Sequence, residues 1–450
     1  MGSWRSTSVV VTLAVATALG GCDGADPPEA DGIGGSPTTA AAGGPTTASA
    51  GPATSAGTST PSAPRGAGRV ARTIQMLRSQ QTALDQKAYR GYEATWAAEV
   101  RTARRRGRAI AANLRSMRVA QTSFHVVRSS LRATNAPGRS ADPDLPAGQG
   151  SWTLEVDVGW RFDDVVGQDM VSRLAYTMLA VDGMAKVTEI TASRGARQPI
   201  WLVSGLHTSR GRGGVLVIAP TAERAAGLAR WMQVARRDVQ GVLHDWPGHL
   251  ITYSPATRSQ FDSIVGAAKR EYDDIAAVTV TVDGSAEGHG PVAIVVNPRI
   301  WPFLRPVGRH VVLTHEATHV ATGGTTSNLP LWLTEGFADY VAVTAARVPV
   351  NVAAAAALRV VRRQGPPRRL PANREFAATK PDLESTYELS SLVMLTIVRN
   401  VGRCRLVDFY RDADAHPAHL EAVLERDLGT SAATLTSRWR RLLVGLAGAQ

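Results

Sequence analysis

The sequence predicts an α+β protein with two folded units behind a long N-terminal tail. The chain has 450 residues, more than one ordinary domain needs, and 44% of them are hydrophobic, which is enough for sizeable cores. The middle of the chain holds a series of strand-like segments. The last third is mostly helical in pattern and contains the residues most informative about chemistry.

The first 22 residues have the pattern of an export signal. Arg5 precedes an apolar run, Val9–Leu19, that is too short to cross a bilayer and fits a signal-peptide core. The run ends in LGGC, which resembles the bacterial lipoprotein signal (lipobox), in which the cysteine becomes the lipidated first residue. That cysteine is Cys22. An ordinary secretory signal followed by a chance cysteine is the alternative.

Residues 23–69 consist mainly of Gly, Pro, Ser, Thr and Ala, with almost no large apolar side chain. Such a segment buries too little surface to offset its chain entropy, so it predicts a disordered tether. A tether behind a lipidated Cys22 predicts an extracytoplasmic lipoprotein, anchored to the outer face of the bacterial cell membrane. The other cysteine, Cys404, is then either a packed small hydrophobe or a reactive thiol, and packing is the expectation.

The formal net charge of +12 comes almost entirely from arginine. This bias indicates either an anionic partner, such as phospholipid head groups, or arginine-rich coding in a GC-rich genome. No nucleic-acid-binding motif accompanies the charge, so we expect no nucleic-acid partner. The glycines near residue 211 do not form a phosphate-binding loop, and the sequence has no G-x-S-x-G nucleophile elbow.

Residues 70–206 predict an α+β accessory domain. A helical pattern runs from 70 to about 108, with arginines 101–108 at its end, and strand-like segments follow as far as 199–206. In WTLEVDV, apolar and acidic residues alternate, which is typical of a half-buried antiparallel strand. Helices followed by such a sheet resemble the cystatin-like (SnoaL-like) cone. We find no catalytic set within it.

Residues 207–450 predict a second unit with a small mixed sheet and many helices. Strand-like runs at 215–220, 249–255, 276–284 and 291–298 surround a helix at 221–243. Two helices follow, the first ending at Gly323-Gly324 and the second beginning near Pro330. Most of the remaining sequence is helical in pattern.

The first of these two helices carries the motif HEATH. His315 and His319 are four residues apart, so their rings project from one helix face and can share one zinc ion. Glu316 stands beside the first of them, where it can reach a water on the metal and take its proton. The alternative is an inactive or purely structural site.

The second helix supplies the rest of a site. Catalytic zinc takes three protein ligands and keeps one open position, and Glu335 can be the third ligand. Asp339 faces the same way, four residues later. It can accept the other ring N–H of His315 and so fix its tautomer, or it is a simple surface carboxylate.

HEATH followed by WLTEGFADY resembles the gluzincin zinc metallopeptidases, and within them the peptidase-MA-like group. The resemblance implies one Zn²⁺ held by His315, His319 and Glu335, with Glu316 as general base and Asp339 behind a ligand. It implies hydrolysis of a peptide or protein substrate at the cell surface. The alternatives are a catalytically silent zincin-fold lipoprotein that acts as a ligand- or envelope-binding module, and a membrane- or polyanion-binding module with structural zinc.

Two further roles follow from the same resemblance. Tyr387 occupies the place where related chains carry a tyrosine ahead of a long helix, so its phenol is a candidate to stabilise the oxyanion; otherwise it is a packing residue. The segment 291–297 resembles the edge strand that holds an extended peptide by main-chain hydrogen bonds, or it is a core strand.

Overall fold

The computed structural model describes residues 67–134, 150–163, 169–203, 205–266, 272, 275–282, 292–377 and 380–448. The lipidation residue Cys22, the signal peptide and almost all of the tether lie outside the described residues. Within the described part of the chain, no helix combines the length and apolarity that crossing a bilayer requires.

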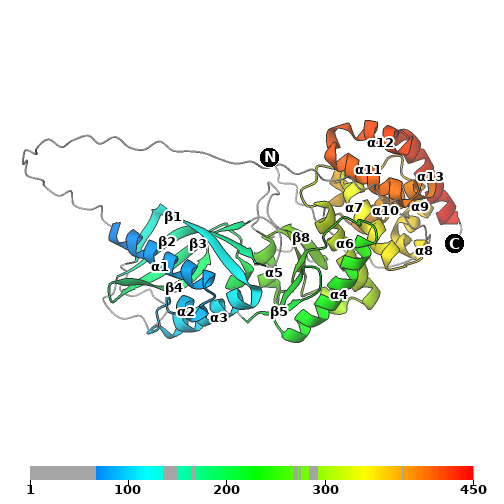
Figure 1. Cartoon of the computed structure of the whole chain (residues 1–450). Coiled ribbons are helices and arrows are strands. Elements are labelled where there is room, and N and C mark those ends of the chain that lie inside the picture. The colour runs from blue at the N-terminus through cyan, green and yellow to red at the C-terminus, as the bar shows by residue number, and fades with distance from the viewer. Residues whose placement is uncertain are drawn as a thin grey trace, which may run out of the picture.

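The N-terminal unit packs helices on an antiparallel sheet, on the left of Figure 1. Its elements are α1 (Ala67–Asp85), α2 (Tyr89–Glu93), α3 (Arg101–Met117), β1 (Val119–Thr134), β2 (Ser151–Phe162), β3 (Met170–Val181), β4 (Met184–Ala192) and the 3-10 helix η1 (Ile200–Leu202). The strands form a meander in the order β1-β2-β3-β4, every neighbouring pair antiparallel. Strand β2 alternates half-buried and buried residues over most of its length, as WTLEVDV predicts.

Two details of this unit differ from the sequence-based expectation. The helix predicted to continue to about residue 108 is interrupted at 86–88 and again after α2, where the main chains of Thr95 and Ala97 hydrogen-bond to Val187 on β4. The arginines 101–108 therefore begin α3 and do not end a helix. The segment predicted as a strand at 199–206 contains η1, in which Leu202 N–H donates to Pro199 O.

The second unit contains a mixed sheet and a helical C-terminal part. Its strands are β5 (His207–Arg210), β6 (Val215–Ala219), β7 (Leu250–Tyr253), β8 (Ala277–Thr281) and β9 (Val292–Val296). The sheet order is β5-β6-β7-β9-β8; β6, β7 and β9 are parallel, and the two outer strands are antiparallel to their neighbours. The chain is thus α+β with a mainly helical C-terminal part, as predicted.

Most helices of this second unit lie to the right of the sheet in Figure 1, and α5 lies to its left, toward the N-terminal unit. They are α4 (Ala222–Gln240), α5 (Arg258–Val265), α6 (Pro306–Thr322), α7 (Leu331–Ala345), α8 (Val350–Ala353), α9 (Ala355–Gln364), α10 (Leu383–Val401), α11 (Arg403–Ala415), α12 (Leu420–Leu428) and α13 (Ala432–Gly448), with the 3-10 helices η2 (Trp301–Phe303), η3 (Asn373–Phe376) and η4 (Pro417–His419). Cys404 is exposed on α11, outside the buried stripe of that helix, so the expectation of a packed cysteine was wrong.

The two faces of the mixed sheet belong to different hydrophobic cores. Val215 and Val217 face α4, α6 and the C-terminal helices, whereas Leu216 and Ile218 belong to the core of the N-terminal unit. Strand side chains alternate between faces, and β6 and β7 are buried at every residue, so both faces of the sheet are covered at these inner strands. The N-terminal unit is therefore packed against the back of the sheet whose front supports the candidate site.

The segment predicted as an edge strand, 291–297, is placed inside the sheet. It forms β9, which pairs with β7 on one side and β8 on the other. Of the two alternatives left open for this segment, the structure thus shows the core strand, because two neighbouring apolar strands do not reveal from local pattern which one lies outside. Among the described residues the outer strand on this side is β8.

Candidate metal centre

Helices α6 and α7 carry the candidate site, and local sequence explains where each begins and ends. Pro306 opens α6, where its missing N–H costs nothing, and Gly323 ends it in the left-handed conformation with φ +64°. Helix α7 follows Pro330. The short connection turns the chain back so that α6 and α7 pack together.

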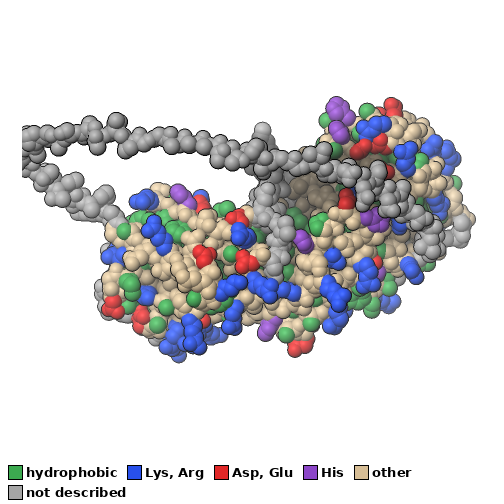
Figure 2. Space-filling model, in the orientation of Figure 1, with side chains coloured by type: hydrophobic (Ala, Val, Ile, Leu, Met, Phe, Trp, Pro, Cys, Tyr) green, Lys and Arg blue, Asp and Glu red, His purple; other side chains and the backbone are tan. Residues whose placement is uncertain are grey.

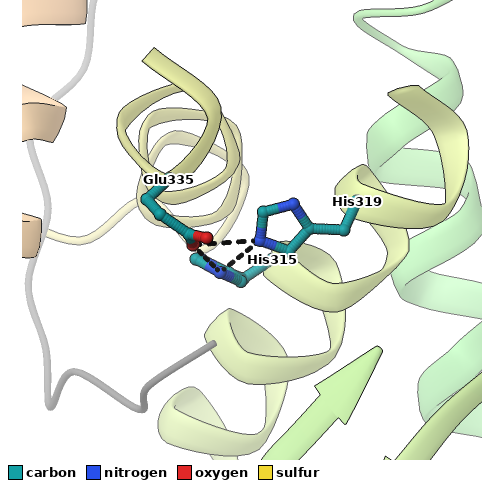
Figure 3. A group of neighbouring side chains, drawn as sticks. All are labelled: His315, His319 and Glu335. Carbon is teal, nitrogen blue, oxygen red and sulfur yellow. Dashed lines mark hydrogen bonds and ion pairs between the residues drawn. The ribbon is translucent and has the colours of Figure 1, made fainter. Parts of the chain in front are cut away.

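The structure brings His315, His319 and Glu335 to one point, as Figure 3 shows. His319 Nε2 lies 3.0 Å from His315 Nε2 and 3.0 Å from Glu335 Oε2, and His315 Nε2 lies 3.3 Å from the same carboxylate oxygen. Tetrahedral ligands with zinc bonds of 2.0–2.1 Å are separated by about 3.3 Å. The three atoms are therefore already spaced as zinc ligands are, and the donor set of two imidazoles and one carboxylate suits that metal.

Asp339 orients the first histidine. Its Oδ1 lies 2.7 Å from His315 Nδ1, and both side chains are buried. This contact places the ring proton on Nδ1 and leaves the Nε2 lone pair free to bind a metal. The alternative of a surface carboxylate does not agree with the burial of Asp339.

Buried charges set the protonation of the cluster. Burial raises the pKa of Glu335, but His319 and His315 lower it further, and the result is about 2. Burial lowers the pKa of His315, and the carboxylates of Asp339 and Glu335 more than compensate, so its pKa lies well above the ordinary value. A cation that binds Nε2 therefore displaces a proton from it. Glu335 is therefore ionised at neutral pH, the form that binds a cation.

Glu316 lies beside the ligand cluster and is only 2% exposed. Its Oε2 accepts a hydrogen bond of 2.6 Å from Thr279 Oγ1 on β8, and the same hydroxyl lies 3.2 Å from the Glu316 main-chain oxygen. Burial raises the pKa of Glu316, although the two histidines and the Thr279 hydroxyl oppose that rise.

Tyr387 is fully buried on α10, near the ligands. Its ring centre lies 6.2 Å from that of His315, and it contacts Phe376 of η3 edge-to-face at 5.3 Å. Both of the roles considered for it, stabilising an oxyanion and packing, are compatible with this position. The oxyanion role stays a prediction.

Two residues of the site were not found from the sequence. Thr279 sits in an ordinary strand pattern, and no local signal connects it with Glu316. Gly324 was interpreted only as a helix terminator, but a Cβ at this position would lie 2.6 Å from His319 Nδ1. A glycine directly after the helix that carries the candidate ligands is the signal that could have indicated this close approach.

No protein-family model and no curated protein sequence matches the chain. Among solved structures it is similar to an M1 zinc metallopeptidase from Deinococcus radiodurans, a mutant enzyme bound to a Tyr-Ser-Ala substrate. The similarity covers 71% of this chain and 62% of that enzyme, with a TM-score of 0.31 and 14% sequence identity. A likeness at that level does not establish a shared fold, so the geometry of the site has to carry the functional assignment.

Proposed function

We propose that this protein is a zinc-dependent peptidase of the gluzincin type. The observation that carries the proposal is the convergence of His315 Nε2, His319 Nε2 and Glu335 Oε2, with the buried Glu316 directly after His315 on the same helix. Zinc bound there would supply a Lewis acid that polarises a scissile carbonyl and makes water more acidic.

The chain's own residues would move the proton. Glu316 takes a proton from water as the water oxygen attacks the carbonyl carbon of the peptide bond. It then donates that proton to the amide nitrogen, the C–N bond breaks, and a carboxylic acid and an amine are released; the acid gives its remaining proton to the amine or to water. Asp339 holds His315 in the tautomer that leaves Nε2 available to the metal.

Strand β8 is the candidate edge for an extended peptide substrate. It is the outer strand of the described sheet on the side of the site, and its Thr279 contacts Glu316 directly. A peptide paired with the outer side of β8 would be held by main-chain hydrogen bonds close to the base. This arrangement gives β8 the role that the sequence suggested for β9.

The cellular setting is also part of the proposal. The resemblance of LGGC to a lipobox supports a lipid anchor at Cys22, with residues 23–69 as a tether and the enzyme at the outer face of the cell membrane. We divide the remaining chain into an accessory domain, 70–206, and a peptidase domain, 207–450. On the face drawn in Figure 2, Lys and Arg side chains are spread over both units with acidic residues between them.

The proposal is tested by measuring zinc content and hydrolysis of a mixed peptide library. Wild type should contain one zinc per chain and cleave peptides. Glu316→Gln should keep the zinc and lose about 10²- to 10⁴-fold in kcat, the usual contribution of a general base. His315→Ala should lose the zinc. His310→Ala is the matched control, because His310 lies on the same helix but contacts Asp238 at 2.6 Å.

A protein that binds zinc stoichiometrically and cleaves no peptide would refute the hydrolase and favour the silent binding module. Full activity of Glu316→Gln would refute the assigned mechanism. Labelling of wild type with a radioactive fatty acid, compared with Cys22→Ser, tests the anchor separately.

A further inference from the structure

We propose that Thr279 is a positioning residue for the general base Glu316. Its hydroxyl holds one carboxylate oxygen of Glu316 and leaves the other oxygen available to water. This inference rests on the proposed peptidase function and deepens it.

The contact joins two elements that are separate in the sequence. Thr279 lies on β8 and Glu316 on α6, and the hydroxyl is 2.6 Å from Oε2 and 3.2 Å from the main-chain oxygen of the same glutamate. A threonine hydroxyl has one proton, so it can donate to either oxygen, and the shorter distance favours the carboxylate. Both side chains are buried, at 3% and 2% exposure, so water competes little for this bond.

The side chain of Thr279 is directed at the site by strand geometry. Ala277, two residues earlier, belongs to the core on the α6 side of the sheet, whereas Val278 belongs to the core on the opposite side. Alternation therefore places Thr279 on the α6 face. The hydroxyl is fixed to a paired strand, which is a more rigid support than a loop.

A general base next to a metal ion needs a rigidly held hydrogen-bond donor that fixes its carboxylate. A glutamate side chain has several rotatable bonds, and an unrestrained carboxylate so close to a cation can swing away from water or toward the metal. A donor to Oε2 selects one rotamer and leaves Oε1 as the oxygen that takes the proton. Because β8 is also the proposed docking edge for substrate, the same strand would set the distance between peptide and base.

The sheet offers a matched control. Thr252 on β7 is paired with Ile294 on β9, and Ile294 is paired on its other side with Thr279, so the two threonines lie in one row across the same sheet. Thr252 is fully buried, and its hydroxyl finds no hydrogen-bond partner among the described residues. Thr252→Val thus makes the same chemical change in the same layer without touching Glu316.

The experiment compares the full chain with Thr279→Val, Thr279→Ser and Thr252→Val. Thr279→Val should lower kcat about tenfold, with KM and zinc content unchanged, because a hydrogen bond to a charged group is lost at the base. Thr279→Ser keeps the hydroxyl and should restore most of the rate. Thr252→Val should resemble wild type. Equal kcat in the two valine variants, or equal losses in Thr279→Val and Thr279→Ser, would overturn the inference.

A second measurement does not depend on activity. In protein labelled with ¹³C at glutamate carboxyls, the Glu316 signal is identified by its absence in Glu316→Gln. Thr279→Val should shift that signal and Thr252→Val should not. An unmoved signal would overturn the role of Thr279 even if peptides are cleaved, whereas a moved signal in a protein without peptidase activity would support the contact and refute only the proposed reaction.

Discussion

Replacing Asp339 by asparagine tests whether the carboxylate behind His315 strengthens the metal site. The two groups are 2.7 Å apart and their side chains are 3% and 5% exposed, so water screens their interaction very little. Asparagine keeps the shape and one acceptor oxygen but removes the negative charge that makes the imidazole a stronger donor to metal. Changes at such outer partners typically cost 10- to 100-fold in metal affinity, or about 1.4–2.7 kcal/mol.

The assay is competition for zinc against a chromophoric chelator at pH 7, with peptide hydrolysis measured on zinc-loaded protein. Asp238→Asn is the matched control, because Asp238 forms a similar contact of 2.6 Å with His310, which also lies on α6 but outside the ligand cluster. We expect Asp339→Asn to bind zinc at least tenfold more weakly than Asp238→Asn. If the two variants bind zinc with the same affinity as wild type, Asp339 does not act through His315 in the way described here.

Three further predictions concern packing and charge. Gly324→Ala should weaken zinc binding, because its Cβ would displace the ring of His319. Gly323→Ala, at φ +64° with no atom nearer than 3.9 Å, should lower the melting temperature without a specific effect on zinc binding. Similar zinc affinities of the two variants would contradict this prediction. Deleting residues 67–206 should give an insoluble or molten protein, because the apolar side chains on the back of the mixed sheet become exposed to water. Solubility and near-UV circular dichroism measure this. A soluble, cooperatively unfolding fragment would show that this packing is dispensable. Glu388→Gln should raise the free energy of unfolding at pH 7 by on the order of 3 kcal/mol or less. The reason is that burial raises the pKa of Glu388 to about 8, although the hydrogen bond from the Ala357 N–H opposes part of that rise.

The sign of that last effect follows from linkage. A carboxyl whose pKa is higher in the folded state binds its proton more tightly there. The stability that this tighter proton binding gives to the folded state is fully present below the pKa of the unfolded state, about 4.3. It is lost as the pH rises through the folded-state pKa of about 8. The advantage of Glu388→Gln should therefore disappear near pH 4 and grow toward pH 8 in thermal or urea unfolding. A difference that does not vary with pH would contradict the burial of an ionisable group at this position.

Most of the candidate metal cluster was accessible from the sequence because its geometry is local. Two histidines one helical turn apart lie on the same face of any helix. A second helix that follows a short connection is expected to pack alongside the first. Glu335 was nominated because catalytic zinc takes a third protein ligand, Asp339 because it lies four residues later on the same helix face, and the resemblance to gluzincins implied both roles. No long-range information was needed to nominate these residues.

The order of strands was not accessible in this way. The β8 and β9 segments are both short and apolar, and only pairing across the sheet shows that β9 is internal and β8 is outside. The break near Thr95 likewise depends on hydrogen bonds to Val187, about ninety residues away in the chain. Helical periodicity on either side of that break gives no sign of it.

Sequence alone therefore determined the α+β composition and nominated the metal-binding and proton-transfer residues, because periodicity and side-chain chemistry are properties of short segments. Tertiary structure decided which strand borders the site, which hydroxyl contacts Glu316, and that one sheet joins two hydrophobic cores. These features form when segments distant in the sequence pack against each other. The free energy of that burial depends on which surfaces come into contact, and the pattern within either segment does not determine it.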